Sequence, residues 1–421
     1  MRIVVAHNFY QQPGGEDQVF AAEVELLRAH GHQVETYAVH NHRINEMGAA
    51  KRLVSLVWNP DTAAELGNLA RSHRAEVVHF HNTFPLISPA AYTAARAAGA
   101  AVVQTLHNFR LLAPCALLFR EGKVCEVCLG RRIAWPGVVH GCYRGSRTTT
   151  AATAGMIALH RAMGTWDLAV DLYIAPTPFA KRKFIAGGLP ADKLFVKPNF
   201  LDPDPGVGPG NGGYAIMVGR LSEEKGVETA LAAWKMLGDV LPLKIVGDGP
   251  LAPLVRDSAA QSPAIEWLGR RPLEEVCDLM GRAAMLVFPS LCYETFGRVI
   301  VEAFAKGTPV VASNLGAMAD LVEDGRTGAL FEAGNALALA AQVRRLAATP
   351  HSLRVMRRAA RNEYAQRYTG PTNRDLLMQA YRIALGGRAF SNENLASTDV
   401  GGFSRSPSRI APLGAAVTEA P

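Results

Sequence analysis

The 421-residue sequence lacks an uninterrupted apolar run of the roughly 20 residues that a bilayer span requires. Its most apolar helical stretch, residues 151–169, is broken by His160, Arg161 and Asp167. Nothing that resembles a secretory leader precedes the first strand-like run, which starts at Arg2. These absences argue against an integral membrane protein and predict a cytoplasmic one.

Cysteine is scarce as well, with six residues in the chain, and charged residues make up only 19% of it. In a reducing compartment, clustered cysteines indicate metal or redox chemistry before disulfides. Hydrophobic residues make up 49%, a globular composition, and the length suggests two domains. The net charge of +7 favours anionic partners, which include nucleic acid, acidic membrane surfaces and phosphorylated ligands.

Short apolar runs alternate with helical patterns in both halves of the chain, which predicts two doubly wound parallel sheets of the α/β class. The strands expected in the first half are 2–7, 34–39, 76–81, 101–106 and 172–176, and those in the second are 214–219, 243–246, 265–268, 285–289 and 309–312. A segment rich in proline and glycine, 198–213, separates the halves and is typical of a hinge.

The predicted domains are an N-terminal one, 1–197, with a cysteine-containing insertion at about 113–147, and a C-terminal one, 214–368. A final helix, 369–385, is expected to pack back toward the N-terminal domain. The tail, 386–421, is rich in Ser, Gly, Ala and Pro and is expected to be disordered.

The strongest chemical signal is a strand end followed by a loop that carries Glu294 and by a helix, expected to begin near Thr295, that carries Glu302. Ligands of open parallel sheets bind beyond the carboxyl ends of the strands, where helix N-termini attract anions. Glu294 is expected to face the cleft, and Glu302 could accept hydrogen bonds from a ribose diol. The alternative is two solvated glutamates on a helix.

A second constellation begins where the 214–219 strand ends at Gly219. Arg220 and Lys225 follow and could both contact a diphosphate, Arg through its planar fork and Lys through a compact ammonium. The alternative is structural, with Arg220 paired to Glu223 or Glu224 and Lys225 solvated.

Four blocks of the C-terminal half resemble the donor domain of the family 4 glycosyltransferases, which have the GT-B architecture of two facing Rossmann-like domains. The blocks are 219–226, 246–250, 294–302, and 307–313 running on to Gly316 and Asp324-Gly325. The resemblance implies a retaining glycosyltransferase (a hexosyltransferase) with a nucleotide diphosphate sugar as donor.

The resemblance also implies residue roles. Arg220 and Lys225 bind the distal phosphate, Glu302 the ribose hydroxyls and Glu294 the transferred sugar. Backbone N–H groups near Phe296 and Gly297 complete the pocket, beside the Gly219 and Gly247 turns. The leaving phosphate itself takes the acceptor's proton, so that neither a protein base nor a cofactor is required.

In the N-terminal half, the segment Pro13-Gly14-Gly15-Glu16 looks like the family's glycine loop, which closes over the diphosphate and admits the acceptor. An ordinary strand-to-helix turn is the alternative. His107 ends a strand where the resemblance places an active-site histidine, and Asn108 follows it on the acceptor side. His79 and His81, on the preceding strand, are interpreted as core or rim residues hydrogen-bonded to backbone.

Cys115, Cys125, Cys128 and Cys142 lie within 28 residues in the insertion and include a Cys-x2-Cys step. Such spacing could hold a structural zinc ion and fold a segment with little apolar content, and ordinary reduced thiols are the equal alternative. Six basic residues against two acidic ones, with apolar residues interleaved, fill 120–147. This segment could rest on the anionic inner face of a membrane beside a lipid-linked or saccharide acceptor, or be a solvated basic loop.

Two other functions stay open at the level of sequence. A sugar phosphorylase or nucleotide-sugar epimerase would share the fold and the phosphate site. A non-catalytic zinc protein that binds nucleic acid would use the cysteines and the basic excess. The second is disfavoured because it leaves the 294–302 block unexplained.

Overall fold

The computed structural model describes residues 1–11 and 14–386, which belong to the unit Met1–Gly387. Pro13 of the glycine loop and residues 387–421 of the expected disordered tail lie outside the described residues.

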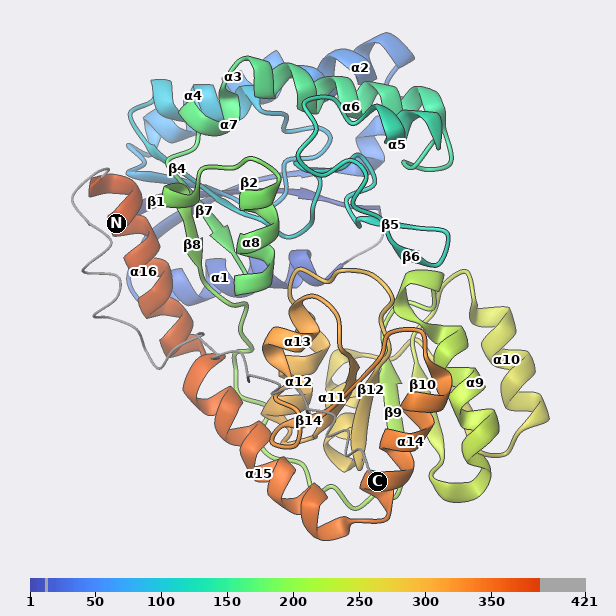
Figure 1. Cartoon of the computed structure of the whole chain (residues 1–421). Helices are drawn as coiled ribbons and strands as arrows, with labels where there is room; N and C mark the ends of the chain where they lie inside the picture. The colour runs from blue at the N-terminus through green and yellow to red at the C-terminus, as the bar shows by residue number, and fades with distance from the viewer. Residues whose placement is uncertain (12–13, 387–421) are drawn as a thin grey trace, which may run out of the picture. The chain divides into compact units, whose positions relative to one another are not determined.

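Two six-stranded sheets, each with parallel pairing between its neighbouring strands, organise the chain (Figure 1). The first has the order β2-β1-β3-β4-β7-β8 and is made of β1 (Arg2–Phe9), β2 (Gln33–His40), β3 (Val77–Phe80), β4 (Ala101–Thr105), β7 (Leu172–Ala175) and β8 (Leu194–Val196). The second has the order β11-β10-β9-β12-β13-β14 and is made of β9 (Ala215–Val218), β10 (Leu243–Val246), β11 (Ile265–Gly269), β12 (Met285–Phe288), β13 (Val310–Ser313) and β14 (Gly328–Phe331). The predicted α/β class with two Rossmann-like sheets is confirmed.

Helices connect the strands, as parallel neighbours require. The first half holds α1 (Gly15–Ala29), α2 (Ala49–Val57), α3 (Pro60–Ser72), α4 (Ala90–Ala97), α5 (Trp135–Val139), α6 (Arg147–Ala162), α7 (Thr165–Leu168) and α8 (Pro178–Ala186), with a short hairpin of β5 (Phe119–Arg120) and β6 (Lys123–Val124). The second half holds α9 (Val227–Leu237), α10 (Ala252–Gln261), α11 (Leu273–Arg282), α12 (Arg298–Ala305), α13 (Ala317–Leu321), α14 (Ala336–Ala347), α15 (Pro350–Arg367) and α16 (Gly370–Gly386). The 3-10 turns are η1 (Asn41–Glu46), η2 (Ala191–Lys193), η3 (Glu223–Lys225) and η4 (Gly238–Val240).

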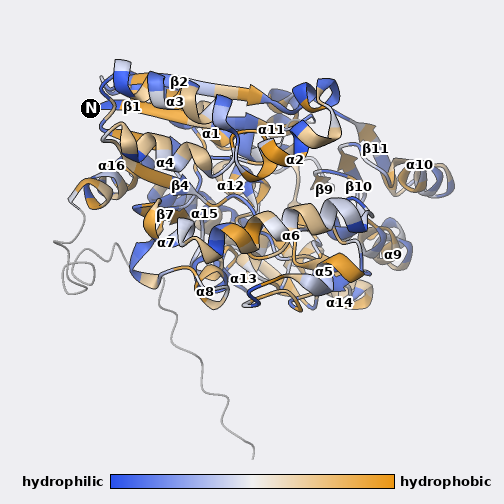
Figure 2. Ribbon diagram, turned by 90° about the horizontal axis from the view of Figure 1, so that it is seen from above, coloured by the Kyte–Doolittle hydropathy of each residue, from blue (hydrophilic) through white to orange (hydrophobic). Residues whose placement is uncertain are grey.

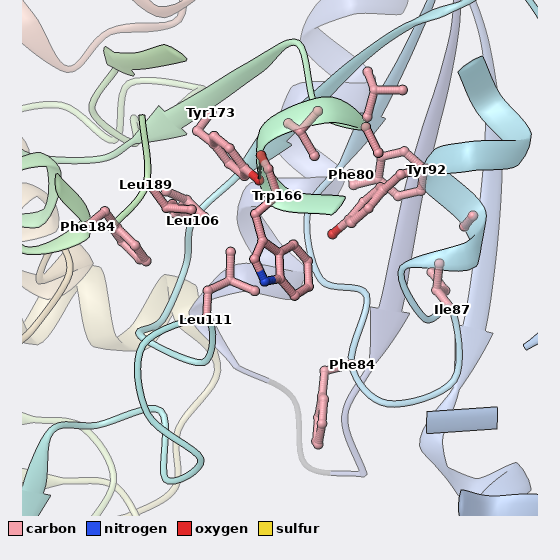
Figure 3. Packing of buried hydrophobic residues seen from close by; sticks show 14 of the residues in the cluster. Phe80, Phe84, Ile87, Tyr92, Leu106, Leu111, Trp166, Tyr173, Phe184 and Leu189 are labelled. Atoms are coloured by element: carbon pink, nitrogen blue, oxygen red, sulfur yellow. Dashed lines mark hydrogen bonds between the residues drawn. The ribbon is translucent and has the colours of Figure 1, made fainter. Parts of the chain in front are cut away.

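The central strands are apolar because helices cover both faces of each sheet. All four residues of β3, β7, β12 and β13 are buried. One face of the first sheet packs on a core rich in aromatic rings, in which Phe80, Tyr92, Trp166 and Tyr173 lie close together (Figure 3). The Tyr173 hydroxyl is satisfied there, since it donates to the Trp166 carbonyl at 2.8 Å.

The other face of the first sheet is covered partly from far along the chain. Leu377, Ala380 and Tyr381 of α16 share a hydrophobic cluster with Ile3 and Val5 of β1. In this way the last described helix closes the core of the first half.

The strand order reverses between β1 and β3 in the first sheet and between β9 and β12 in the second. Loops that leave neighbouring strands diverge at such points and open a crevice at the carboxyl edge of the sheet. The segments that carry Glu16, Arg220 and Glu294 leave β1, β9 and β12, whereas His107 follows the neighbouring strand β4 and Gly247 follows β10.

Candidate active site

The loop after β9 and the loop after β12 are joined by backbone contacts. The Leu291 N–H donates to the Glu224 carbonyl at 2.8 Å. Gly226 has φ +69°, and a Cβ on it would lie 1.9 Å from the Pro289 carbonyl oxygen. Only glycine can therefore occupy this position, and the Arg220–Gly226 block is brought against the block that carries Glu294.

The same tight packing fixes the second glycine turn. A Cβ on Gly247, whose φ is +141°, would lie 1.8 Å from the Gly219 carbonyl oxygen. The Gly219 N–H donates to the Val246 carbonyl at 3.0 Å, and the Leu221 N–H donates to the Asp248 carbonyl at 3.0 Å. Two of the four blocks singled out in the sequence thus form one backbone surface at the end of β9 and β10.

Lys225 and Glu294, which the sequence placed on different substrate groups, form an ion pair with Nζ 2.6 Å from Oε1. Ser290 Oγ donates to the same carboxylate oxygen at 2.9 Å. Burial opposes the charge of Lys225, but the Glu294 carboxylate outweighs it and raises the pKa of the ammonium. Lys225 therefore keeps its positive charge at neutral pH, and Ser290 is a residue of the site that sequence reasoning missed.

Arg220 lies at the start of the loop after β9 and has an exposed side chain. The predicted alternative, in which Arg220 pairs with Glu223 or Glu224, is not found: Glu224 Oε1 instead accepts a hydrogen bond from Ser222 Oγ at 2.6 Å. An exposed guanidinium can form two parallel hydrogen bonds to a phosphate or a carboxylate.

Two details of the 294–302 block differ from the sequence-based expectation. The helix α12 begins at Arg298 rather than near Thr295, because Gly297 is left-handed (φ 93°) and precedes the first helical residue. Glu302 is buried, with 5% of its surface exposed, and its Oε1 lies 3.1 Å from Arg298 Nε, which excludes the solvated-glutamate alternative. Burial raises the pKa of Glu302 against the pull of Arg298.

Phe296 is also buried and packs near Tyr368, with ring centroids 6.1 Å apart. Its side chain anchors the loop, so any part in ligand binding falls to the backbone at Phe296 and Gly297.

His107 lies against the loop that carries Glu294. Its carbonyl oxygen accepts a hydrogen bond from Thr295 Oγ1 at 2.7 Å, and the Thr295 carbonyl accepts one from Thr177 Oγ1 at 2.9 Å. The structure therefore brings His107 and Glu294 to one place, although they lie in different sheets. His79 and His81 are fully buried, and their ring nitrogens contact side chains rather than backbone, which corrects the predicted backbone bonding.

The glycine loop ends where α1 begins at Gly15, and Gly14 caps that helix with its N–H donated to Asp17 Oδ2 at 2.7 Å. Asp17 Oδ1 in turn lies 2.7 Å from His7 Nε2. Among the residues that the structure describes, none would place an atom within 4 Å of a Cβ on Gly14 or Gly15.

Glu16 contacts Asn108, and also Tyr10 and Arg110, which sequence reasoning missed. Asn108 and Tyr10 hydrogen-bond to the Glu16 carboxyl group, whose Oε1 is buried without a partner. Burial, followed by the neighbouring Asp17, raises the pKa of Glu16 to about 8 against the pull of Arg110. Glu16 is therefore protonated at neutral pH and can donate a hydrogen bond.

The four cysteines of the insertion gather around Gly137. Cys128 Sγ and the Pro114 ring lie 3.4 and 3.7 Å from the Cβ position of Gly137, and the Cys142 N–H donates to the Gly137 carbonyl at 3.0 Å. Burial and the other three thiols raise the pKa of Cys142 to about 11. Leu118, Cys128 and Ala134 belong to the main core cluster, so the insertion has more apolar anchoring than its composition predicts.

Tetrahedral zinc at about 2.3 Å from each thiolate would place the sulfurs about 4 Å apart. Within residues 1–11 and 14–386, the four cysteines are not among the groups of three or more side chains placed so that they could share a metal ion. The cysteines as placed do not form a tetrahedral set, and zinc binding stays a prediction of the sequence. Metal analysis decides it: one zinc ion per wild-type chain, and none after Cys125→Ser with Cys128→Ser, is the result expected if the prediction holds.

Family models match most of the chain. The model described as Glycosyltransferase Family 4 matches residues 13–205, and the one described as Glycosyl transferases group 1 matches residues 212–349. The boundary between the two matches falls in the expected hinge, 198–213.

Curated relatives match over shorter stretches. A glycogen synthase of Mycobacterium tuberculosis is 35% identical over 175 residues, 40% of this chain and 42% of that protein. A phosphatidyl-myo-inositol mannosyltransferase of Propionibacterium freudenreichii is 32% identical over 161 residues, 37% of this chain and 40% of that protein. The chain thus spans about two fifths of the length of these relatives.

Solved structures resemble the whole unit. The Anabaena protein HepE in complex with UDP and glucose has a TM-score of 0.65 at 19% identity, covering 90% of this chain and 99% of HepE. WaaG, a glycosyltransferase involved in lipopolysaccharide biosynthesis, has a TM-score of 0.61 at 16% identity, covering 91% of this chain and all of WaaG (100%). These likenesses confirm the two-domain GT-B fold.

Proposed function

Because the chain belongs to the family 4 glycosyltransferases, we propose that it transfers a hexose-type sugar from a nucleotide diphosphate donor to an acceptor hydroxyl, with retention of anomeric configuration. The observation that carries the proposal is the joined pair of loops after β9 and β12. They hold a charged Lys225 against Glu294 and leave Arg220 open beside them.

The bond between the anomeric carbon and the phosphate breaks as negative charge accumulates on the departing diphosphate. Arg220, Lys225 and the N-terminus of α12 supply positive charge to that group, which is the largest electrostatic requirement of the reaction. Glu294 orients the sugar and holds Lys225. The departing phosphate accepts the proton of the acceptor hydroxyl on the same face, which retains the configuration without a protein base or a divalent cation.

The test is a thermal-shift screen with UDP-, GDP- and ADP-sugars, followed by turnover with the stabilising donor in the presence of a chelator. We expect one nucleotide class to raise the melting temperature and turnover to survive chelation. No stabilisation by any nucleotide sugar, or activity lost on chelation and restored by magnesium, would overturn the proposal. A phosphorylase or epimerase would instead turn over the donor with orthophosphate, or without any acceptor.

The acceptor side gives a pH-dependent prediction. The folded-state pKa of Glu16, about 8, lies above the 4.5 of the free group, so the protonated form that can donate to an acceptor hydroxyl is present below pH 8 and is lost above it. At pH 9 about one tenth of the molecules retain this proton, and we expect the KM for the acceptor to rise about tenfold between pH 7 and pH 9. Initial rates with saturating donor measure this change.

Glu16→Gln is the matched control, because an amide keeps the donor and cannot titrate. It should flatten the pH profile of the acceptor KM. A profile with the same rise in both proteins would remove Glu16 from the acceptor site.

A membrane-facing surface is proposed on the first half of the chain. Apolar side chains are exposed there on α2, α5 and α6, and both α2 and α5 contact α6. The ribbons of α5 and α6 carry hydrophobic segments in Figure 2. The exposed residues are Leu53 and Val54 of α2, Ile133, Trp135 and Val139 in and before α5, and Leu159 of α6. Exposed Lys51, Arg52, Arg131 and Arg132 border them. This combination is typical of a surface that binds anionic lipid, where a lipid-linked acceptor would be found.

Within the described residues no helix has both the length and the apolar character to cross a bilayer. We expect wild-type protein to float with vesicles that contain anionic phospholipid. The double variant Leu53→Glu with Trp135→Glu should lower the bound fraction about tenfold, since each substitution removes apolar area that the membrane would cover and adds a negative charge. Leu337→Glu is the matched control, because Leu337 is 67% exposed on α14 of the other half. Equal flotation of all three proteins would rule this surface out.

A further inference from the structure

A buried series of charged and polar side chains leads from the interior of the first half of the protein to His107. It begins at Lys197, whose Nζ lies 2.5 Å from Glu23 Oε1, with both side chains fully buried. Glu23 Oε2 lies 3.4 Å from His81 Nε2, and His81 Nδ1 lies 3.0 Å from His107 Nε2. The site described above requires only the last of these groups.

The electrostatic environment determines the charge of Glu23, which pairs with Lys197. Burial opposes ionisation of Glu23, but the Lys197 ammonium together with the neighbouring His81 and His79 outweighs it and holds the pKa of the carboxyl well below its usual range. The ionised Glu23 can only accept hydrogen bonds. Its Oε2 and the Nε2 of His81 are both buried without another hydrogen-bond partner, so the stable arrangement places a proton on His81 Nε2, facing the carboxylate.

The proton on His81 Nε2 determines which nitrogen of His107 carries a proton. A neutral imidazole carries one N–H and one lone pair, so His81 with a proton on Nε2 offers a lone pair at Nδ1. The nitrogen that faces it, His107 Nε2, must then be the donor. The two rings lie nearly parallel at 21° with centroids 5.2 Å apart, which restricts rotation of His107. Burial first, and the His81 ring second, hold the pKa of His107 well below its usual range.

A metal site is the alternative interpretation of the side chains around Glu23. The ligand atoms of Glu23, His79 and His81 lie within 4.8 Å of one another, as those of a metal site do. Two facts disfavour a metal ion there. Lys197 already balances the carboxylate, and both ring nitrogens of His79 are in hydrogen bonds, Nδ1 with the Tyr381 hydroxyl (2.9 Å) and Nε2 with Thr105 Oγ1 (2.8 Å).

We propose that Glu23 and His81 are positioning residues that hold His107 as the neutral tautomer protonated on Nε2, which leaves its Nδ1 as an acceptor for a hydroxyl of the transferred sugar. The inference rests on the proposed function, since it assigns that hydroxyl to a sugar held by the Glu294 loop. Thr295, which follows Glu294, binds the His107 carbonyl and sets the distance between the two residues. Helix α16 also packs against these groups, because the Tyr381 hydroxyl hydrogen-bonds to His79 and Asn373 Oδ1 lies 3.4 Å from Lys197 Nζ.

Two variants of His81 distinguish its hydrogen bond to His107 from the packing of its ring. His81→Asn can place an amide oxygen where Nδ1 stood and accept the His107 N–H. His81→Phe keeps the stacked ring and removes the acceptor. Loss of one such hydrogen bond corresponds to about a tenfold change. We expect His81→Phe to lower kcat about tenfold, His81→Asn to retain kcat within about threefold, and both to bind nucleotide with wild-type affinity. His351→Phe, an exposed histidine on α15, is the control.

The direct readout is the nitrogen-15 spectrum of the imidazole rings, with His107 assigned by its absence from His107→Gln. The expected spectrum shows His107 protonated on Nε2 in the wild type and in His81→Asn, and a mixture of tautomers in His81→Phe. A wild-type His107 protonated on Nδ1 or on both nitrogens, or a His81→Phe enzyme with wild-type kcat, would overturn the inference. Failure of the wild type to bind any nucleotide sugar would instead overturn the proposed function, and the spectrum reads out the tautomer independently of that result.

Discussion

Replacing Lys225 with alanine is expected to lower kcat/KM by about 1,000-fold, the loss seen when one group that stabilises transition-state charge is removed from a closed site. The ammonium is the charge nearest to Glu294, at 2.6 Å, and it is held in the loop that Gly226 packs against Pro289. Without it the diphosphate leaves with only Arg220 and helix N–H groups to stabilise it. Steady-state kinetics with the donor identified by the thermal screen measure the effect.

Lys235→Ala is the matched control for this variant, because Lys235 is an exposed lysine of α9, the helix that follows the same loop. It should keep wild-type kcat/KM. Lys225→Arg should recover part of the loss through its charge. Wild-type activity in Lys225→Ala would show that the ion pair with Glu294 is structural and that the phosphates bind elsewhere.

Removing the carboxylate of Glu302 is expected to have the largest effect on folding as well as on donor binding. Glu302→Leu leaves Arg298 buried without a counter-charge, because their side chains are 6% and 15% exposed. Breaking a buried pair in this way costs about 3–5 kcal/mol of unfolding free energy. Denaturant unfolding of the free protein measures this loss.

Glu302→Gln separates the two roles of the residue. The amide keeps the volume and one acceptor oxygen, so we expect a smaller loss of stability and a nucleotide affinity reduced about tenfold by the missing charge-assisted hydrogen bond to a ribose hydroxyl. The double variant Arg298→Met with Glu302→Leu should recover much of the stability and none of the affinity. If nucleotide binds the double variant with wild-type affinity, Glu302 is a structural residue alone.

The fold was predictable because it depends on patterns that act locally. Apolar runs such as 101–106 have the length of strands and are apolar throughout, as strands buried on both faces are. The amphipathic helices between them connect strands that pair in parallel. The helix start after Glu294 was predicted three residues too early, because the left-handed Gly297 ends the loop and no capping side chain marks that position. The residues of the donor loops were found because each follows a strand end.

What the residues of the site do to one another was not predictable, because these contacts join distant parts of the chain. Lys225 and Glu294 are 69 positions apart, and nothing in either block shows that their side chains pair. His81 is a buried core residue, as the sequence suggests, but its contact with the His107 ring is not visible in the sequence. Glu16 has an ordinary sequence environment, and its raised pKa arises only from burial and from the groups that the fold places around it.

The sequence by itself determined the fold class, the family and the positions of the glycine turns, since these depend on the order and spacing of residues along the chain. Only the tertiary structure decided which charges are neutralised, which protons are held and which thiols approach one another. The physical reason is that burial and pairing act over a few ångströms through space. Lys197, Glu23, His81 and His107 reach that range only after helix α1 and the carboxyl ends of β3, β4 and β8 have been brought together.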